Sequence, residues 1–178
     1  MKSEELRNLQ APLKEKYRNQ PGSALITLKA EGKTGDSISC KVETGRALAE
    51  AGLHPATGGD GMRLCSGDML LEALVACAGV TLRAVSTAMN IDIKEAVVRA
   101  EGDLDFRGTL GVSKEVPVGF RAIRLSFILD TEASTEQINS LLRRTERYCV
   151  VYQTLISATE VRTKIETIEQ YDHLSGSK

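Results

Sequence analysis

The sequence lacks the features that mark several classes of protein. Its 23 lysine and arginine residues nearly balance its 24 aspartate and glutamate residues, and a chain without a strongly basic composition does not suit nucleic-acid binding. No uninterrupted apolar run reaches the roughly 18–20 residues of a membrane-spanning helix. The first ten residues are charged where a signal peptide is apolar. These absences predict a cytoplasmic protein with no nucleic-acid and no membrane partner.

Motifs for metals, nucleotides and serine hydrolases are also missing. The two histidines, His54 and His173, have no ligand-like spacing to any cysteine, which argues against a zinc site. The glycine-rich stretches fit neither a P-loop nor a GxGxxG turn, and no GxSxG nucleophile motif occurs. We therefore expect no metal and no bound cofactor, and cysteine chemistry is the chemistry that remains.

The four cysteines are far apart and include no CxxC pair: Cys40, Cys65, Cys77 and Cys149. In a reducing compartment such spacing does not indicate a disulfide scaffold. A free cysteine usually behaves as a small buried hydrophobe. Cys40 falls on the apolar side of an alternating run, and we predict core positions for Cys40 and Cys65.

Two predicted helices carry the other two cysteines. The longest periodic segment runs from about 67 to 90 and is apolar nearly all round, so it must be covered by more than one neighbour. A two-fold interface that uses the same surface twice is the simplest cover. Cys77 lies in this segment, and Cys149 ends a second helix that opens with a capping box at Ser134. A fold that packs the two helices together can bring these thiols into contact.

The remaining segments predict strands on either side of the long helix. Strand-like runs over 24–43 come first, and a glycine-rich loop with one helical turn near 47–50 leads to the helix. Two alternating runs, 96–106 and 120–129, should pair as an antiparallel hairpin. A last strand is expected over 159–167. This order of elements favours an α+β domain.

Three regions of different character divide the chain. A short helix with one apolar stripe forms an N-terminal extension over residues 1–22, and Pro21 ends it. The main domain spans residues 23–169. We expect residues 170–178 to form a disordered tail.

A buried thiol is inert unless a neighbouring group stabilises its thiolate. Three cations lie on the loops and strands that lead to the long helix, namely Lys33, Arg46 and Arg63. Asp68 and Glu72, in the first turns of that helix, could orient such a cation. Glu72 fits equally well as a charge on a solvent-facing helix surface, so these residues are candidates.

Three stretches of the sequence carry a family resemblance: SGDMLLEALVACAGVTLRAV, VGFRAIRLSFIL and TERYCVVYQTL. They are similar to the osmotically inducible protein C and organic hydroperoxide resistance family (OsmC/Ohr), and the likeness spans about residues 24–168. The resemblance implies an OsmC-like fold with antiparallel sheets packed around long central helices. It also implies an interlocked homodimer with paired cysteines at the subunit interface.

The same resemblance implies a thiol-dependent peroxidase that reduces organic hydroperoxides. Cys77 would attack the peroxide, and Cys149 would resolve the resulting sulfenic acid as a disulfide. A dithiol reductant, which in the family resembles a lipoyl group, would then reduce that disulfide.

The sequence departs from the family pattern at three positions. Lys33 stands nearest to the family's arginine, and a lysine cannot clamp a carboxylate with a bidentate fork. Gly67, with Asp68 beside it, stands where the family has a glutamate, and Val150 replaces a proline. Two alternatives to the enzyme stay open. One is a non-catalytic dimeric module that binds an apolar small molecule at the subunit interface, with cysteines that are structural or redox-sensing. The other is a purely structural role for both thiols.

Overall fold

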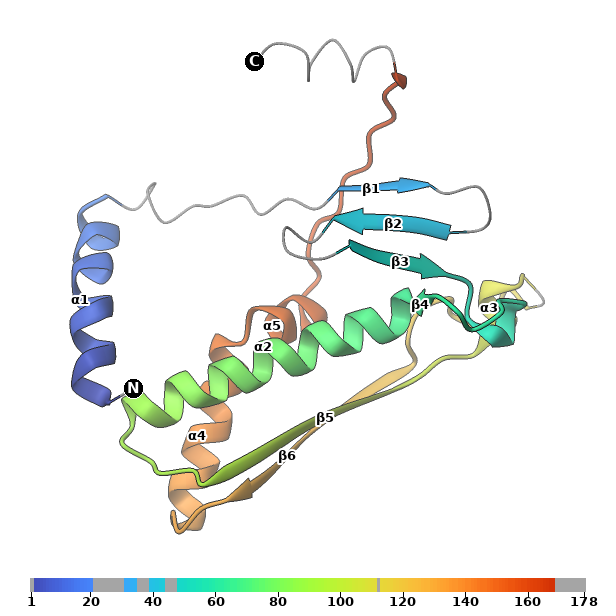
Figure 1. Cartoon of the computed structure of the whole chain (residues 1–178). Helices are drawn as coiled ribbons and strands as arrows, with labels where there is room; N and C mark the ends of the chain where they lie inside the picture. The colour runs from blue at the N-terminus through green and yellow to red at the C-terminus, as the bar shows by residue number, and fades with distance from the viewer. Residues whose placement is uncertain (1, 21–30, 35–38, 44–47, 112, 169–178) are drawn as a thin grey trace.

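The computed structural model describes residues 2–20, 31–34, 39–43, 48–111 and 113–168. Helices and strands are mixed along the chain, which confirms the predicted α+β class. Helix α1 (Ser3–Asn19) stands at one end of the molecule, near the C-terminal end of the long helix α2 (Ser66–Ala88) (Figure 1). The predicted tail and the first predicted strand up to residue 30 lie outside the described residues.

A small sheet lies above the N-terminal half of α2 (Figure 1). Its strands follow one another in the order β1-β2-β3-β4, and the pairing of β3 with β4 is parallel while the others are antiparallel. The bounds are β1 (Glu31–Thr34), β2 (Ser39–Glu43), β3 (Leu48–Gly52) and β4 (Leu64–Cys65). The helical turn predicted near 47–50 is therefore wrong. Residues LAEAG lack a strand pattern of their own, and pairing with β2 makes them a strand.

A long antiparallel hairpin forms the second sheet, as the two alternating runs predict. Strand β5 (Glu95–Asp103) pairs with β6 (Ala122–Asp130), and Val98 stands opposite Phe127. Alternate residues of both strands face inward, and the others are exposed. The hairpin's apolar side faces α2, so this sheet has one wet face and one packed face.

A glycine in β5 explains why a phenylalanine can precede β6 so closely. An added Cβ at Gly102 would lie 2.4 Å from Cε1 of Phe120. The ring of Phe120 thus packs against bare backbone, which no side chain at position 102 would allow without a shift of the ring.

Helix α2 supplies the centre of the core. Its buried residues recur every four positions, at Leu74, Ala78, Leu82 and Ser86. This stripe packs against β5, α4 (Thr135–Tyr148) and α5 (Val150–Ile156). Full burial of one leucine side chain contributes about 1.5–3 kcal/mol. The capping box predicted at Ser134 is confirmed at the start of α4.

The side of α2 away from this stripe is only partly covered by the described residues. Val80 is 73% exposed, and 22% of the helix's most apolar stretch is buried. By length and composition alone, α2 is the one helix of the described chain that could cross a membrane, a test that core helices of soluble proteins also pass. A single chain leaves its most apolar helix half uncovered.

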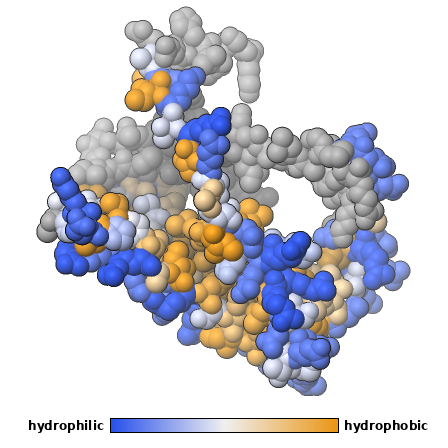
Figure 2. Space-filling view, turned by 180° about the vertical axis from the view of Figure 1, so that it is seen from behind, coloured by the Kyte–Doolittle hydropathy of each residue, from blue (hydrophilic) through white to orange (hydrophobic). Residues whose placement is uncertain are grey.

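Further apolar surface appears on the face seen from behind, where orange patches interrupt the charged surface (Figure 2). Exposed apolar side chains of α5 include Val150 at 69% and Ile156 at 62%. The C-terminal segment after α5 projects beyond the small sheet (Figure 1). Apolar surface of this extent is typical of a chain that contacts another protein surface.

The strand predicted over 159–167 is not formed. Residues 158–167 contain no helix or strand, and Val161 and Ile165 are 83% and 95% exposed. The alternation that predicts a strand is present, but a strand also needs a neighbouring edge with which to pair. Within the described chain, this segment has no such partner.

Candidate active site

The structure brings the two predicted cysteines together. Cys149 belongs to a buried cluster with Leu74 and Ala78 of α2, and Cys77 packs against that cluster. Each thiol influences the pKa of the other, and neither is part of a disulfide. Contact between the inner faces of α2 and the α4–α5 junction, which the periodicity predicted, produces this pair.

Cys149 occupies the break between two helices. It ends α4 as C-cap and begins α5 as N-cap, with extended backbone angles of φ −75° and ψ 109°. The first backbone N–H groups of a helix have no partner within the helix. Those of Val150 and Val151 are therefore available to the sulfur atoms, and both donate toward Cys77.

Opposing influences set the pKa of the Cys77 thiol, and the net result lies below its ordinary value. Burial is the largest single influence and raises the pKa. Hydrogen bonds from the N–H of Val151, the thiol of Cys149 and the N–H of Val150 together outweigh it, since they stabilise the thiolate. Cys77 is half-buried, so a small reactant can reach a thiolate that is already stabilised.

The pKa of the Cys149 thiol shifts in the opposite direction, above its ordinary value. Burial raises the pKa of its thiol, and the neighbouring sulfur of Cys77 raises it further. Donation from the N–H of Tyr152 lowers it by less. With 1% of its surface exposed, Cys149 loses its proton less readily than Cys77 does. Of the two thiols, Cys77 is therefore the better candidate for a nucleophile.

The cations expected near the thiol are not placed there by the described chain. Lys33 lies in β1, in register with Lys41 of β2, and its side chain and all of Arg46 are outside what the structure describes. Arg63 contacts Glu50 at 2.9 Å and Asp60 at 3.5 Å, beside the small sheet. None of the described influences on the pKa of Cys77 comes from a cation.

Asp68 and Glu72 occupy other faces of α2. At about 100° per residue, Asp68 points roughly 180° away from Cys77, and Glu72 roughly 140° away. Both residues are exposed. Within a single chain they cannot contact the thiol pair, and any role in activating it requires a cation or a second chain between them.

Asp68 lines a cavity of about 340 Å³ together with His54 and Cys65, and neither Cys77 nor Cys149 is among its lining residues. The His54 ring stacks on Phe106 at 4.9 Å, and its Nδ1 accepts the N–H of Ala56. The core position predicted for Cys65 is wrong, because this residue is half-buried at the start of α2 and lies outside both core clusters. The side chain of Cys40 lies outside the description.

The sequence analysis missed the groups that act on the Cys77 thiol. The N–H groups of Val150 and Val151 carry no side-chain signal, since any residue supplies them. Thr81 does carry one, because a threonine four residues after a cysteine lies beside it on a helix. Its hydroxyl donates to the carbonyl of Cys77 at 2.8 Å and also lowers the pKa of that thiol. Among the described residues, no three histidine, cysteine or acidic side chains converge as metal ligands would.

A protein-family model described as OsmC-like protein matches residues 58–164. No curated protein matches the sequence at a significant level. Several solved structures share the fold. An OsmC-like protein from Mycoplasma pneumoniae is 16% identical, with a TM-score of 0.63 over 75% of this chain and 89% of that one.

Two further structures are described as organic hydroperoxide resistance proteins. The protein from Elizabethkingia anophelis is 15% identical with a TM-score of 0.61, and the one from Legionella pneumophila is 16% identical with a TM-score of 0.59. Each alignment covers 75% of this chain and 91% of the other. The TM-scores establish a common fold, and the family match includes both Cys77 and Cys149.

Proposed function

Since this chain belongs to the OsmC-like protein family, we propose that it is a thiol-dependent peroxidase that reduces organic hydroperoxides. One observation carries the proposal: Cys77 and Cys149 are in contact, and their pKa values move in opposite directions. A peroxidatic thiol must be ionised and reachable, and a resolving thiol must lie close to it. Two structural relatives described as organic hydroperoxide resistance proteins agree with this substrate class.

The reaction needs two steps at the thiol pair. The Cys77 thiolate attacks one peroxide oxygen, the O–O bond breaks, and an alkoxide leaves and takes a proton while the sulfur becomes a sulfenic acid. The Cys149 thiol then attacks that sulfur, water leaves, and a disulfide forms before further oxidation. A dithiol reductant attacks the disulfide and restores both thiols.

A positive charge completes the site in this proposal. The leaving alkoxide gains from a nearby cation, and Lys33 is our first candidate, with Arg46 and Arg63 as the others. Asp68 and Glu72 would orient that cation from the start of α2. Because both acids lie on other faces of α2 from Cys77, we expect a second chain to bring these groups together.

We also infer an interlocked homodimer, because apolar surface of the single chain is left uncovered. The uncovered side of α2, including Val80, and the unpaired segment around Val161 and Ile165 both need apolar cover. A second copy can supply it by burying the two α2 helices together between the sheets. We propose that residues 23–169 form this dimerising domain, that residues 1–22 extend it, and that it works in the cytoplasm.

Mass spectrometry of the intact protein tests the proposal directly. One equivalent of cumene hydroperoxide should remove two hydrogens from the wild-type chain, and peptide mapping should find a Cys77–Cys149 disulfide. Cys149→Ser should consume about one equivalent and leave a sulfenic acid at Cys77 that dimedone traps. If neither thiol of the wild type is oxidised, the proposed peroxidase is wrong and the non-catalytic binding module takes its place.

A further inference from the structure

A hollow of about 410 Å³ lies where α4 meets α5. Cys149 is among the residues that line it, and Cys77 is not. Six of its eight described lining residues carry polar side chains: Arg147, Tyr148, Gln153, Thr154, Ser157 and Thr159. Polar side chains lose hydration when another surface covers them. The hollow is therefore distinct from the apolar surface that the inferred homodimer must bury.

The oxidised thiol pair would offer a reductant two sulfur atoms, and these differ as leaving groups. In thiol–disulfide exchange a thiolate attacks one sulfur and the other departs, and a thiol of lower pKa departs faster. Burial raises the pKa of the Cys77 thiol, but the hydrogen bonds to it bring that pKa below its ordinary value. Burial raises the pKa of the Cys149 thiol. Attack on Cys149, with Cys77 as the leaving group, is the faster of the two routes.

One charged side chain lines the described part of the hollow, and it is Arg147. This residue lies in the last turn of α4, and its Cζ is 5.9 Å from the centre of the Tyr148 ring. That distance is within the range of a cation–π contact, which keeps the guanidinium beside the hollow.

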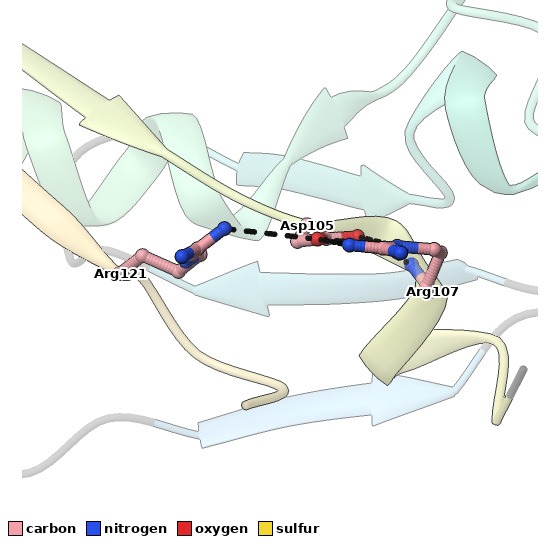
Figure 3. Close-up of polar contacts among 3 residues, drawn as sticks. All are labelled: Asp105, Arg107 and Arg121. Carbon is pink, nitrogen blue, oxygen red and sulfur yellow. Dashed lines mark hydrogen bonds and ion pairs between the residues drawn. The ribbon is translucent and has the colours of Figure 1, made fainter. Parts of the chain in front are cut away.

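Two other arginines of the surface pair with a carboxylate, and Arg147 does not. Arg107 and Arg121 lie on either side of Asp105 (Figure 3), with nitrogen–oxygen distances of 2.6 and 3.9 Å. No acidic side chain of the described chain forms an ion pair with Arg147. Glu146 precedes it in α4 but does not line the hollow. The positive charge of Arg147 is thus available to an incoming anion.

We propose that reduction of the Cys77–Cys149 disulfide begins at Cys149 through this hollow, and that Arg147 attracts the incoming thiolate of the reductant. The inference rests on the proposed function, because it concerns the disulfide that the peroxidase would form. It deepens that function by naming the sulfur and the cation that a thiol reductant meets.

The exchange has two steps with a dithiol. Its thiolate bonds to Sγ of Cys149, the bond between the two protein sulfurs breaks, and Cys77 leaves as a thiolate. The second thiol of the reductant then displaces Cys149 from the mixed disulfide. The dithiol departs as a disulfide, its two electrons stay on the protein sulfurs, and its protons pass to Cys149 and to Cys77 or water.

Trapping of the mixed disulfide tests which sulfur is attacked. Diamide oxidises the full-length protein without peroxide, and peptide mapping verifies that the disulfide joins Cys77 to Cys149. Brief exposure to 2-mercaptoethanesulfonate, which has no second thiol, is followed by N-ethylmaleimide. The adduct should be on Cys149 and the maleimide on Cys77. The reverse pattern would overturn the proposal, and it would leave the peroxidase standing if cumene hydroperoxide still forms the disulfide.

Two thiols with the same carbon frame test the charge of Arg147. The thiolate of 2-mercaptoethanesulfonate is doubly negative, whereas that of cysteamine carries an ammonium group and has no net charge. Arg147→Gln should slow reduction by the sulfonate about threefold, the size of effect that one exposed charge supplies. Reduction by cysteamine should change by less than about 1.5-fold, and added salt should narrow the gap between wild type and variant.

A control variant places the effect at the hollow. Arg99→Gln removes the same charge from the exposed side of β5 and should leave both rates unchanged. Equal slowing of both thiols by Arg147→Gln would indicate a structural role and would overturn the proposed role of the charge. A loss in Arg99→Gln as large as in Arg147→Gln would do the same. If the sulfonate fails to reduce the oxidised wild type, the hollow is closed to reductants and the proposal is wrong.

Discussion

Cys77 and Cys65 both belong to the α2 region, and both are half-buried, yet their surroundings differ. Cys77 lies in the middle of the helix, where a second sulfur and the first N–H groups of α5 reach it. Cys65 lies at the N-cap of α2, makes no capping hydrogen bond through its thiol, and lines a cavity with His54 and Asp68. The degree of burial is similar, so burial alone does not select the reactive thiol.

The difference between the surroundings of Cys77 and Cys65 comes from helices α4 and α5. The α4–α5 break places a second thiol and two backbone donors beside Cys77, and nothing equivalent is described beside Cys65. Peroxide chemistry requires a resolving partner as well as a stabilised thiolate. Of these two positions, we therefore expect it at Cys77.

Serine substitutions at the two positions give the largest expected contrast. Cys77→Ser should abolish consumption of cumene hydroperoxide, because the attacking sulfur is gone. Cys65→Ser removes a sulfur of similar burial from the same helix region and should keep the rate within about twofold. Stopped-flow measurement of the first turnover checks both. Equal losses in the two variants would erase the distinction between the two thiols.

Substitution of Lys33, the first candidate for the cation near Cys77, gives a second test of this site. Lys33→Met should slow first-turnover oxidation at neutral pH by about a hundredfold, since a lost electrostatic contact to a leaving oxyanion costs about 10²–10³ in rate. Lys33→Arg should keep or improve the rate.

A matched control for Lys33 is Lys94, which directly precedes β5. Lys94 pairs with Glu132 at 2.7 Å, so Lys94→Met removes the same charge away from the thiols and should leave the rate unchanged. If the Lys33 variant retains the wild-type rate, Arg46 or Arg63 becomes the candidate.

The pH dependence of alkylation compares the two members of the thiol pair. A free cysteine thiol titrates at about 8.5. Because the pKa of Cys77 is lowered, its thiolate should form at a lower pH than that of a free thiol. Cys149, with a raised pKa, should reach its thiolate form only at higher pH. Iodoacetamide labelling followed by peptide mapping should therefore modify Cys77 first as pH rises. Labelling of Cys149 at the lower pH would contradict the assigned order.

Thr81 gives the smallest expected effect. Thr81→Val keeps the shape of the side chain and removes the weakest named contribution to the lowered pKa of Cys77. The labelling profile of Cys77 should move upward by a few tenths of a pH unit, and the rate at neutral pH should fall by about twofold or less. Thr87→Val is the control, because the Thr87 hydroxyl donates to the carbonyl of Arg83, further along α2. A profile that stays in place would remove Thr81 from the site.

The sequence predicted the parts of the fold that depend on local periodicity. Helix α2, the β5–β6 hairpin and the capped helix α4 each carry a periodic pattern of their own, and all three are confirmed. The meeting of Cys77 with Cys149 was predictable too, because both lie on apolar faces that a single core must bring together.

The parts that depend on a distant partner could not be predicted in this way. Strand β3 exists because β2 offers it an edge, and the segment around Val161 stays unpaired because no described edge is beside it. Backbone donors such as the N–H of Val151 leave no trace in a residue pattern. Periodicity identifies the faces of an element, and tertiary neighbours decide what those faces meet.

The segment that contains Val161 and Ile165 links the lifetime of the chain to its concentration. An extended, exposed stretch is a ready substrate for proteases, and a partner that covers it protects it by mass action. With the homodimer inferred above, dilution would uncover this stretch in a growing fraction of chains. Cleavage there would then be faster in dilute than in concentrated protein, although no covalent bond and no residue at the thiol pair had changed.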